Sequence, residues 1–294
     1  MKENVICVVH NDLDGVVSYI VLCWLYGRKL DVLSTTPAKL EQDYDKLAAT
    51  KTWDRIYFLD LDVSKIGDKI DKPGTVILDH HKTNLYQFKT GIARIYNETS
   101  CAKLIYDTFF KDTGKTLTSA QKTLIALADD WDSNTKSTPL SESLDIVYHS
   151  MSDKFNSFVE DYYNGFVPFD KFKQNTISLY KKHRAEYINQ LNPFFGKIEF
   201  EGQKDVHVGA VFCEKYVQEC CDWLLQGPQG CDVAIAVLLN QKRIAVRRNS
   251  LNTTIDVSKF VQRIAGGGGH AAAAGGNLTE EFMEFTKMLS PGQD

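Results

Sequence analysis

The sequence lacks the long apolar run that a membrane-spanning helix requires. Its longest nearly apolar stretch, residues 16–26, is far shorter than the roughly 20 residues that cross a bilayer. The opening residues, MKEN, lead into only a short apolar run before His10, so we expect no signal peptide. The sequence therefore predicts a cytoplasmic protein that makes no contact with a membrane.

Paired cysteines and an excess of positive charge are also missing. The 7 cysteines form no CxxC pair and no regular spacing, which predicts buried or free thiols in a reducing cytosol. Lys and Arg number 34 against 38 Asp and Glu, so the formal net charge is −4. This balance excludes a protein that holds nucleic acid mainly by bulk positive charge, whereas a small nucleotide could still be held locally.

What is present is an alternation of strands and helices. The 294 residues, 43% of them hydrophobic, suit a globular protein of one large domain or two ordinary ones. Short β-rich runs at 5–9, 31–34, 55–59 and 75–78 are separated by segments with helical spacing, such as 15–26 and 38–49. This order predicts an α/β fold with a mainly parallel sheet and helices on both faces.

The pattern changes towards the C-terminal half. Helices are expected at 100–111 and 119–129, and the pattern then loosens until a helix at about 172–191, which Asn192-Pro193 ends. Strands and helices return after that break, at 197–201, 206–213, 214–226, 232–239 and 243–248. We expect a first domain at 1–170, a linker helix at 171–195 and a smaller α/β domain at 196–294.

Acids and histidines follow three of the predicted strands. The first strand leads into residues 10–15 (HNDLDG), the third into Asp60, and the fourth into residues 79–81 (DHH). Because the carboxyl ends of parallel strands face one crevice, these side chains are expected to converge there. A further acidic run, residues 129–132 (DDWD), closes a later helix.

So many carboxylates in one crevice would repel one another unless a cation lay among them. Carboxylate and imidazole ligands without thiolate favour manganese or magnesium over structural zinc. The set is large enough for two ions, which would lower the pKa of a bound water from about 15.7 towards about 7. The alternative, that each residue is a helix cap or a satisfied polar group, explains one residue well but the whole set poorly.

These residues resemble the motifs of the DHH phosphoesterase superfamily, which includes RecJ-type nucleases, nanoRNases of the NrnA and NrnB type and cyclic-dinucleotide phosphodiesterases. Residues 10–15 resemble its HxDxDG motif, Asp60 its second motif and residues 79–81 its third. The fourth falls on Asp130, with Asp129 as the alternative. Residues 266–275 (GGGGHAAAAG) resemble the GGGH-xx-AAG motif of the DHH-associated C-terminal domain.

The resemblance implies a role for each matching residue. Asp60 would bridge two manganese ions, with magnesium as the alternative metal. Asp79 would orient a ligand or a water, and His81 would contact the scissile phosphate or help to protonate the leaving group. The implied metal ligands are His10, Asp12, Asp14, Asp60, His80 and Asp130.

The glycine-rich segment 266–276 has two readings of its own. Exposed N–H groups of glycines can cradle an anion, and the alanines after His270 would start a helix whose N-terminus also favours phosphate. The alternative is tight packing against a helix. Upstream, Arg248-Asn249 stands where the family carries an Arg-Ser pair, and Arg247 is an alternative for that arginine. The expected substrate-binding residues are Arg247, Arg248, Gly267, Gly268, Gly269 and His270.

Together these features predict a manganese-dependent phosphodiesterase of exonuclease type. It would hydrolyse short RNA or DNA oligonucleotides to nucleoside monophosphates by in-line attack of hydroxide generated at two metal ions. The alternatives are a cyclic-dinucleotide phosphodiesterase, a phosphatase of 3′-phosphoadenosine 5′-phosphate and a non-catalytic nucleotide-binding module. A homodimer is compatible with the sequence but not required by it.

Overall fold

The computed structural model describes residues 3–81, 83–95, 99–111, 113–200 and 202–280. The chain divides into two compact units, residues 1–180 and 181–294, and each is described by itself. The division falls within helix α8 (Lys171–Asn189), where the sequence predicts a linker helix.

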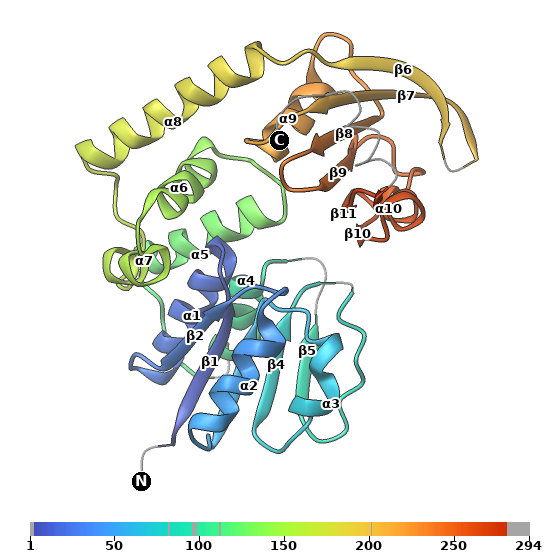
Figure 1. Ribbon diagram of the computed structural model, residues 1–294. Coiled ribbons are helices and arrows are strands. Elements are labelled where there is room, and N and C mark those ends of the chain that lie inside the picture. Colours follow the sequence, from blue (N-terminus) through green and yellow to red (C-terminus); the bar gives the residue numbers. More distant parts are fainter. Residues whose placement is uncertain (1–2, 82, 96–98, 112, 201, 281–294) are drawn as a thin grey trace, which may run out of the picture. The chain divides into compact units, whose positions relative to one another are not determined.

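The first unit is built on a five-stranded sheet in the order β2-β1-β3-β4-β5, and every pairing in it is parallel (Figure 1). The predicted α/β class with a parallel sheet is therefore confirmed. The strands are β1 (Val5–His10), β2 (Asp31–Thr35), β3 (Arg55–Leu59), β4 (Thr75–Asp79) and β5 (Ile92–Ile95). Strand β5 was missed because it is short and exposed at the sheet edge, so it lacks the apolar run of its neighbours.

Helices cover both faces of this sheet, as expected for parallel strands. Along β1, Cys7 and Val9 are buried with α1 (Leu13–Tyr26) and α5 (Ser119–Asp132), whereas Val8 is buried on the other face with α2 (Leu40–Thr50). The remaining short helices are η1 (Ser64–Ile66), α3 (Gly67–Ile70), α4 (Cys101–Ile105) and the π-helical turn η2 (Tyr106–Phe110). Helix α5 begins with a capping box formed by Thr118 and Gln121.

Two helices occupy the stretch in which the sequence pattern loosens. Helix α6 (Pro139–Ser150) begins after the Thr138 cap, and α7 (Lys154–Tyr162) begins after the Asp153 cap. Both bury aromatic side chains, Tyr148 and Phe158 among them, in the same core as α1. These helices are stabilised by this tertiary packing, which the local periodicity of the sequence does not indicate.

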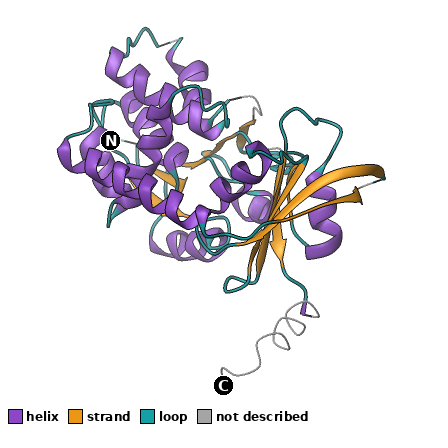
Figure 2. Cartoon of the chain, turned by 90° about the horizontal axis from the view of Figure 1, so that it is seen from above, coloured by secondary structure: helices purple, strands orange, loops and turns teal. Residues whose placement is uncertain are grey.

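The second unit holds a six-stranded mixed sheet in the order β10-β11-β9-β8-β7-β6. Helix α9 (Val217–Gln226) packs on one face and α10 (Val257–Ala265) on the other. The β6–β7 hairpin extends past the other strands (Figures 1 and 2). The strands are β6 (Phe194–Phe200), β7 (Gln203–Phe212), β8 (Val233–Leu238), β9 (Arg243–Arg248), β10 (Gly268–His270) and β11 (Ala273–Asn277).

The helix predicted after His270 is wrong, because the alanines belong to strand β11. This strand pairs antiparallel with both β9 and β10, so sheet hydrogen bonding overrides the helical preference of alanine. The glycines make that pairing sterically feasible. A Cβ at Gly267 would lie 2.1 Å from the Gly275 carbonyl oxygen, and Gly269 has a φ of 146° that other residues rarely adopt.

The seven cysteines are all buried free thiols, as predicted. Within the described ranges, no helix combines the length and the apolar composition needed to cross a bilayer.

Candidate metal centre

The acids and histidines that follow β1, β3 and β4 come together at the carboxyl edge of the parallel sheet. Asp60 lies at their centre, with 1% of its surface exposed. His80 Nε2 lies 3.1 Å from Asp60 Oδ1, and His10 Nδ1 lies 3.4 Å from Asp60 Oδ2. Asp60 has a φ of 58°, a left-handed conformation that costs energy in a non-glycine residue and often marks a functional position.

The first motif forms a tight turn from β1 into α1. Asp12 caps α1, since its Oδ1 accepts a hydrogen bond of 2.9 Å from the Gly15 amide, and its Oδ2 lies 2.7 Å from His10 Nδ1. A Cβ at position 15 would lie 2.2 Å from the His10 carbonyl oxygen. Glycine is therefore required for the helix to start so close to the strand that carries His10.

Asp14 connects this turn to the start of α4. Its two carboxylate oxygens accept hydrogen bonds from the amides of Cys101, at 2.7 Å, and Ala102, at 3.0 Å. The side chain is almost completely buried, so these bonds fix its position beside His80 and Asp132. Ser100 caps the same helix, because its side chain accepts a hydrogen bond from the Lys103 amide.

The third motif is held by a residue that sequence reasoning missed. Asp79 is fully buried, and its carboxylate accepts a 2.8 Å hydrogen bond from Asn84 Nδ2 and lies 2.7 Å from His81 Nδ1. Asn84 also donates to the Leu61 carbonyl oxygen, so it ties the loop after β3 to the loop after β4. No motif points to Asn84, and only its burial as an amide reveals the role.

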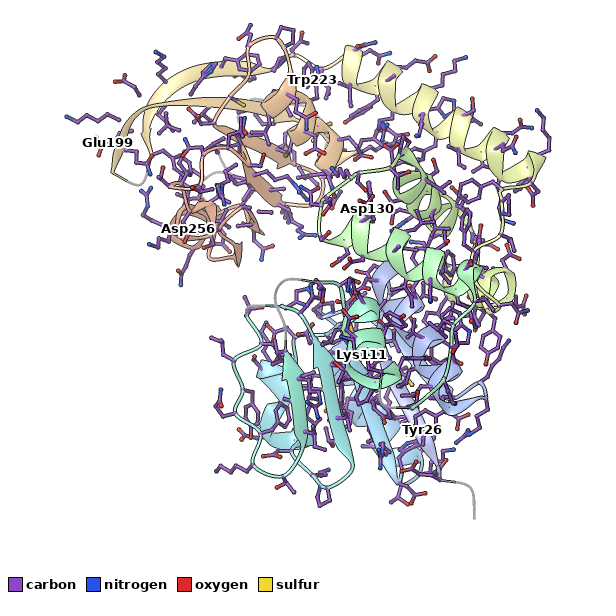
Figure 3. All side chains as sticks on the ribbon, turned by 180° about the vertical axis from the view of Figure 1, so that it is seen from behind. Tyr26, Lys111, Asp130, Glu199, Trp223 and Asp256 are labelled. Atoms are coloured by element: carbon purple, nitrogen blue, oxygen red, sulfur yellow. The ribbon has the colours of Figure 1, made fainter. Side chains whose placement is uncertain are left out.

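The structure differs from the sequence prediction at the fourth motif, because it brings Asp132 rather than Asp130 to the cluster. Asp132 Oδ2 lies 3.3 Å from His80 Nε2. Asp130 instead accepts hydrogen bonds from Ser137 and Ser141, and Asp129 accepts one from the Ser100 amide. Figure 3 labels Asp130 on α5.

Helix geometry explains this difference. We expected the helix to end at residue 129, but α5 continues to Asp132. Residues two positions apart project about 200° apart around a helix, so Asp130 and Asp132 cannot face the same group. Extending the predicted helix through the DDWD run would have placed Asp130 and Asp132 on different faces.

Burial and mutual repulsion perturb the carboxylates of the cluster. Burial, reinforced by the charges of Asp14 and Asp60, raises the pKa of Asp132 to about 9. Burial and the charges of Asp12 and Asp14 raise the pKa of Asp60 well above its ordinary value. For Asp12, burial also acts upwards, but the contact with His10 outweighs it and lowers the pKa to about 2. A divalent cation among these groups would relieve the repulsion.

The donor atoms fit such a cation. Three groups of side chains each have ligand atoms that lie within 4.8 Å of one another, and Asp60 and His80 each belong to two of these groups. Asp132 Oδ2 is shielded from solvent yet accepts no hydrogen bond, as expected of an atom reserved for a metal ion. The groups are Asp60 with Asp79, His80 and His81; His10 with Asp12 and Asp60; and Asp14 with His80 and Asp132.

The substrate-binding residues predicted in the second unit lie on β9, β10 and the segment before β10. The Arg248 guanidinium donates hydrogen bonds to carbonyl oxygens of its own unit. Its Nη1 lies 2.8 Å from the Asn252 oxygen and its Nε lies 3.3 Å from the Ala271 oxygen. Within the part of the chain that the structure describes, the Arg247 guanidinium has no hydrogen-bond or ion-pair partner. Gly267 and Gly269 provide close backbone packing, and the side chain of His270 lies outside what the structure describes. Their role towards substrate stays a prediction.

Comparison with known proteins agrees with this architecture. Residues 229–290 match the DHHA1 domain family. Oligoribonuclease NrnB of Bacillus subtilis (strain 168) is 25% identical over 306 aligned positions, which cover 94% of this chain and 73% of that protein.

Solved structures share the fold. The pGpG-specific phosphodiesterase PggH of Vibrio cholerae superposes with a TM-score of 0.60 at 15% identity, covering 97% of both chains. Exonuclease RecJ bound to manganese superposes with a TM-score of 0.55 at 11% identity, covering 97% of this chain and 88% of that one. The motif order, the parallel sheet and the C-terminal domain together make this chain a member of the DHH superfamily with a DHHA1 domain at its C-terminal end.

Proposed function

We propose that this protein is a manganese-dependent phosphodiesterase of exonuclease type that hydrolyses short oligonucleotides to nucleoside monophosphates. The observation that carries the proposal is the convergence of histidine and aspartate ligands around Asp60. The chain that holds them is similar to an oligoribonuclease over 94% of its length.

Six side chains would hold two divalent ions. Bound ions would supply Lewis-acid stabilisation of the charge on the phosphoryl oxygens and a water of lowered pKa. Asp60 and His80 belong to more than one group, so they are the candidates for joining the two positions. The proposed ligands are His10, Asp12, Asp14, Asp60, His80 and Asp132.

His81, held by Asp79, would donate a proton to the leaving group. The 2.7 Å contact with Asp79 places a proton of the His81 ring on Nδ1 and fixes the orientation of the ring. Burial lowers the pKa of His81, but the contact with Asp79 outweighs it and the net shift is upwards. A protonated His81 could therefore neutralise charge on the leaving oxygen, with Asp79 holding the ring in place.

The relatives support a short substrate. NrnB is named as an oligoribonuclease and PggH as specific for pGpG, which contains only two nucleotides. In this chain, Arg247 and residues 267–270 of the glycine-rich segment are the candidates for binding the terminal nucleotide. Arg248 would act through the turn that it stabilises between β10 and β11.

One substrate panel tests the proposal. Purified protein with manganese is incubated with RNA and DNA of two to five nucleotides, a long single strand, a cyclic dinucleotide and 3′-phosphoadenosine 5′-phosphate. We expect the fastest release of monophosphate from the short linear substrates, and none from a variant with Asp79, His80 and His81 all changed to alanine. Faster turnover of the long strand or of the cyclic dinucleotide would contradict the assignment, and tight binding without turnover would favour a nucleotide-binding module.

A further inference from the structure

The outer edge of strand β6 is open. β6 stands last in the order of its sheet, pairs with β7 on one side, and has no partner strand on the other side among the described residues. Such an edge presents a row of unpaired N–H and C=O groups that can template pairing with another strand. The edge is also regular, because the irregular pairing near the hairpin end places its extra residue on β7, where Asp205 has a φ of 58°.

Apolar side chains flank this edge. Phe194 is 63% exposed, Ile198 42% and Phe212, on the neighbouring strand, 47%. The pairing of β6 with β7 places all three on one face of the sheet, and the rings of Phe194 and Phe212 meet edge to face at 6.3 Å. Exposed apolar side chains beside an open strand edge are typical of an interaction surface rather than of solvent-facing sheet.

The charges on the same strand specify what can pair with it. Lys197 and Glu199 are both exposed, lie two residues apart and so share the opposite face from Ile198. Figure 3 labels Glu199 on the β6–β7 hairpin. An antiparallel strand of the same sequence, centred on Ile198, would place Lys197 opposite Glu199 of the second copy and Glu199 opposite its Lys197. Opposite charges in directly facing positions stabilise a strand pair.

We propose that two copies of this chain associate through antiparallel pairing of their β6 strands, with the two-fold axis at Ile198. The two Ile198 side chains face each other, and the two Lys197–Glu199 pairs close the other face. A slip of the axis by one residue, to Lys197 or to Glu199, places like charges opposite each other, so the charge pattern selects this register. The inference does not depend on the proposed function, because it uses no residue of the metal centre.

The test is the oligomeric state of the full chain, measured by sedimentation velocity over a range of protein concentrations. We expect a monomer–dimer equilibrium that weakens as salt is raised, because exposed charges are screened. In Lys197→Glu both facing positions become acidic, and in Glu199→Lys both become basic. Each change should weaken dimerisation on the order of tenfold or more.

Complementation separates this interface from simple damage to the fold. An equimolar mixture of Lys197→Glu and Glu199→Lys restores opposite charges at both positions, as does the double exchange within one chain, so both should dimerise like the wild type. Ile198→Lys should be monomeric, whereas Leu179→Lys, at a comparably exposed leucine on α8 (53%), should dimerise normally. Circular dichroism of each variant checks that it is folded.

The proposal would be overturned if the wild type stayed monomeric at the highest concentrations. The edge of β6 would then be open to some other partner. A dimer that survives Ile198→Lys and both single charge reversals would also overturn it, because its interface would lie elsewhere.

Discussion

Single residues at the candidate metal centre are fixed by hydrogen bonds to backbone amides and to one another. Asp12 caps α1, Asp14 accepts two amides at the start of α4, and Asp79 is held by Asn84. The motif pattern was sufficient to predict the residues that follow directly from strands, because a strand end leaves little freedom of placement. It was insufficient for Asp132 and Asn84, whose positions depend on how far a helix continues and how a loop folds back.

Asp132→Asn should weaken manganese binding, because it removes a carboxylate oxygen that the protein leaves without a hydrogen bond. Loss of a supporting partner around a metal typically costs about 10–100-fold in affinity, and loss of a ligand should cost at least that much. Isothermal titration calorimetry measures the change. Asp130→Asn is the matched control, since Asp130 is occupied by Ser137 and Ser141 and its loss should leave manganese affinity within a few-fold of the wild type. If Asp130→Asn lost more manganese affinity than Asp132→Asn, Asp130 would be the ligand instead.

Gly15→Ala should destabilise the protein and displace His10. Its Cβ would lie 2.2 Å from the His10 carbonyl oxygen, which is backbone and cannot rotate away. Forcing atoms into such a site typically costs about 1–3 kcal/mol. Urea-induced unfolding measures the loss, and Gly196→Ala provides a control at a glycine of the second unit that has open space around it and no positive φ. Equal losses in both variants would mean that the contact at residue 15 does not matter.

At the scale of elements, the central parallel strands β1, β3 and β4 were predictable because they are largely buried, which gives continuous apolar runs, whereas the short and exposed edge strand β5 was not. Helices α6 and α7 and the β10–β11 hairpin were not, because they form through contacts with partners distant in the sequence. Residues 273–277, with the sequence AAGGN, have no strand preference of their own and become a strand by pairing with β9.

Asp256→Ala should destabilise α10, the helix that precedes the glycine-rich hairpin. The Asp256 carboxylate caps this helix by accepting from the Ser258 amide and hydroxyl (Figure 3 labels Asp256). Loss of such a cap costs about 1 kcal/mol, whereas Asp256→Asn should retain most of it. Urea-induced unfolding at neutral pH compares the three proteins, and equal stability of the alanine variant and the wild type would argue against the cap.

Stability should also follow pH at this cap. The hydrogen bonds from Ser258 lower the pKa of Asp256 below its ordinary value of 3.8. A lowered pKa means that the stabilisation is present above that ordinary value and is lost as pH falls through the folded-state pKa. The advantage of wild type over Asp256→Ala should therefore shrink in acid, whereas the advantage of Asp256→Asn should not.

At the scale of the whole molecule, the structure shows where acidic side chains of the chain gather. Part of the negative charge of the chain is concentrated at one edge of the parallel sheet. Two divalent ions bound there would carry four positive charges, which equals the formal net charge of −4 in magnitude. A protein that looks acidic overall could in this way attract a phosphodiester to one site. The composition alone excluded a bulk nucleic-acid binder but could not show where the acids gather.

Manganese should raise the unfolding temperature of the full chain. An ion that binds only the folded state stabilises it by about 2.7 kcal/mol at 100 times its dissociation constant. Differential scanning fluorimetry with manganese against a chelator measures the shift. Asp60→Ala, which removes the residue shared between groups of ligands, should abolish it; an unchanged shift in this variant would place the bound metal elsewhere.

The central claim is that the residues around Asp60 form a metal centre for phosphodiester hydrolysis. Anomalous diffraction from crystals grown with manganese tests it most directly, because manganese scatters anomalously and its positions can be located without assumption about the ligands. We expect two manganese peaks within bonding distance of carboxylate and imidazole atoms, with Asp60 between them and Asp132 as a ligand. Peaks at other residues, or none at this edge of the sheet, would contradict the account.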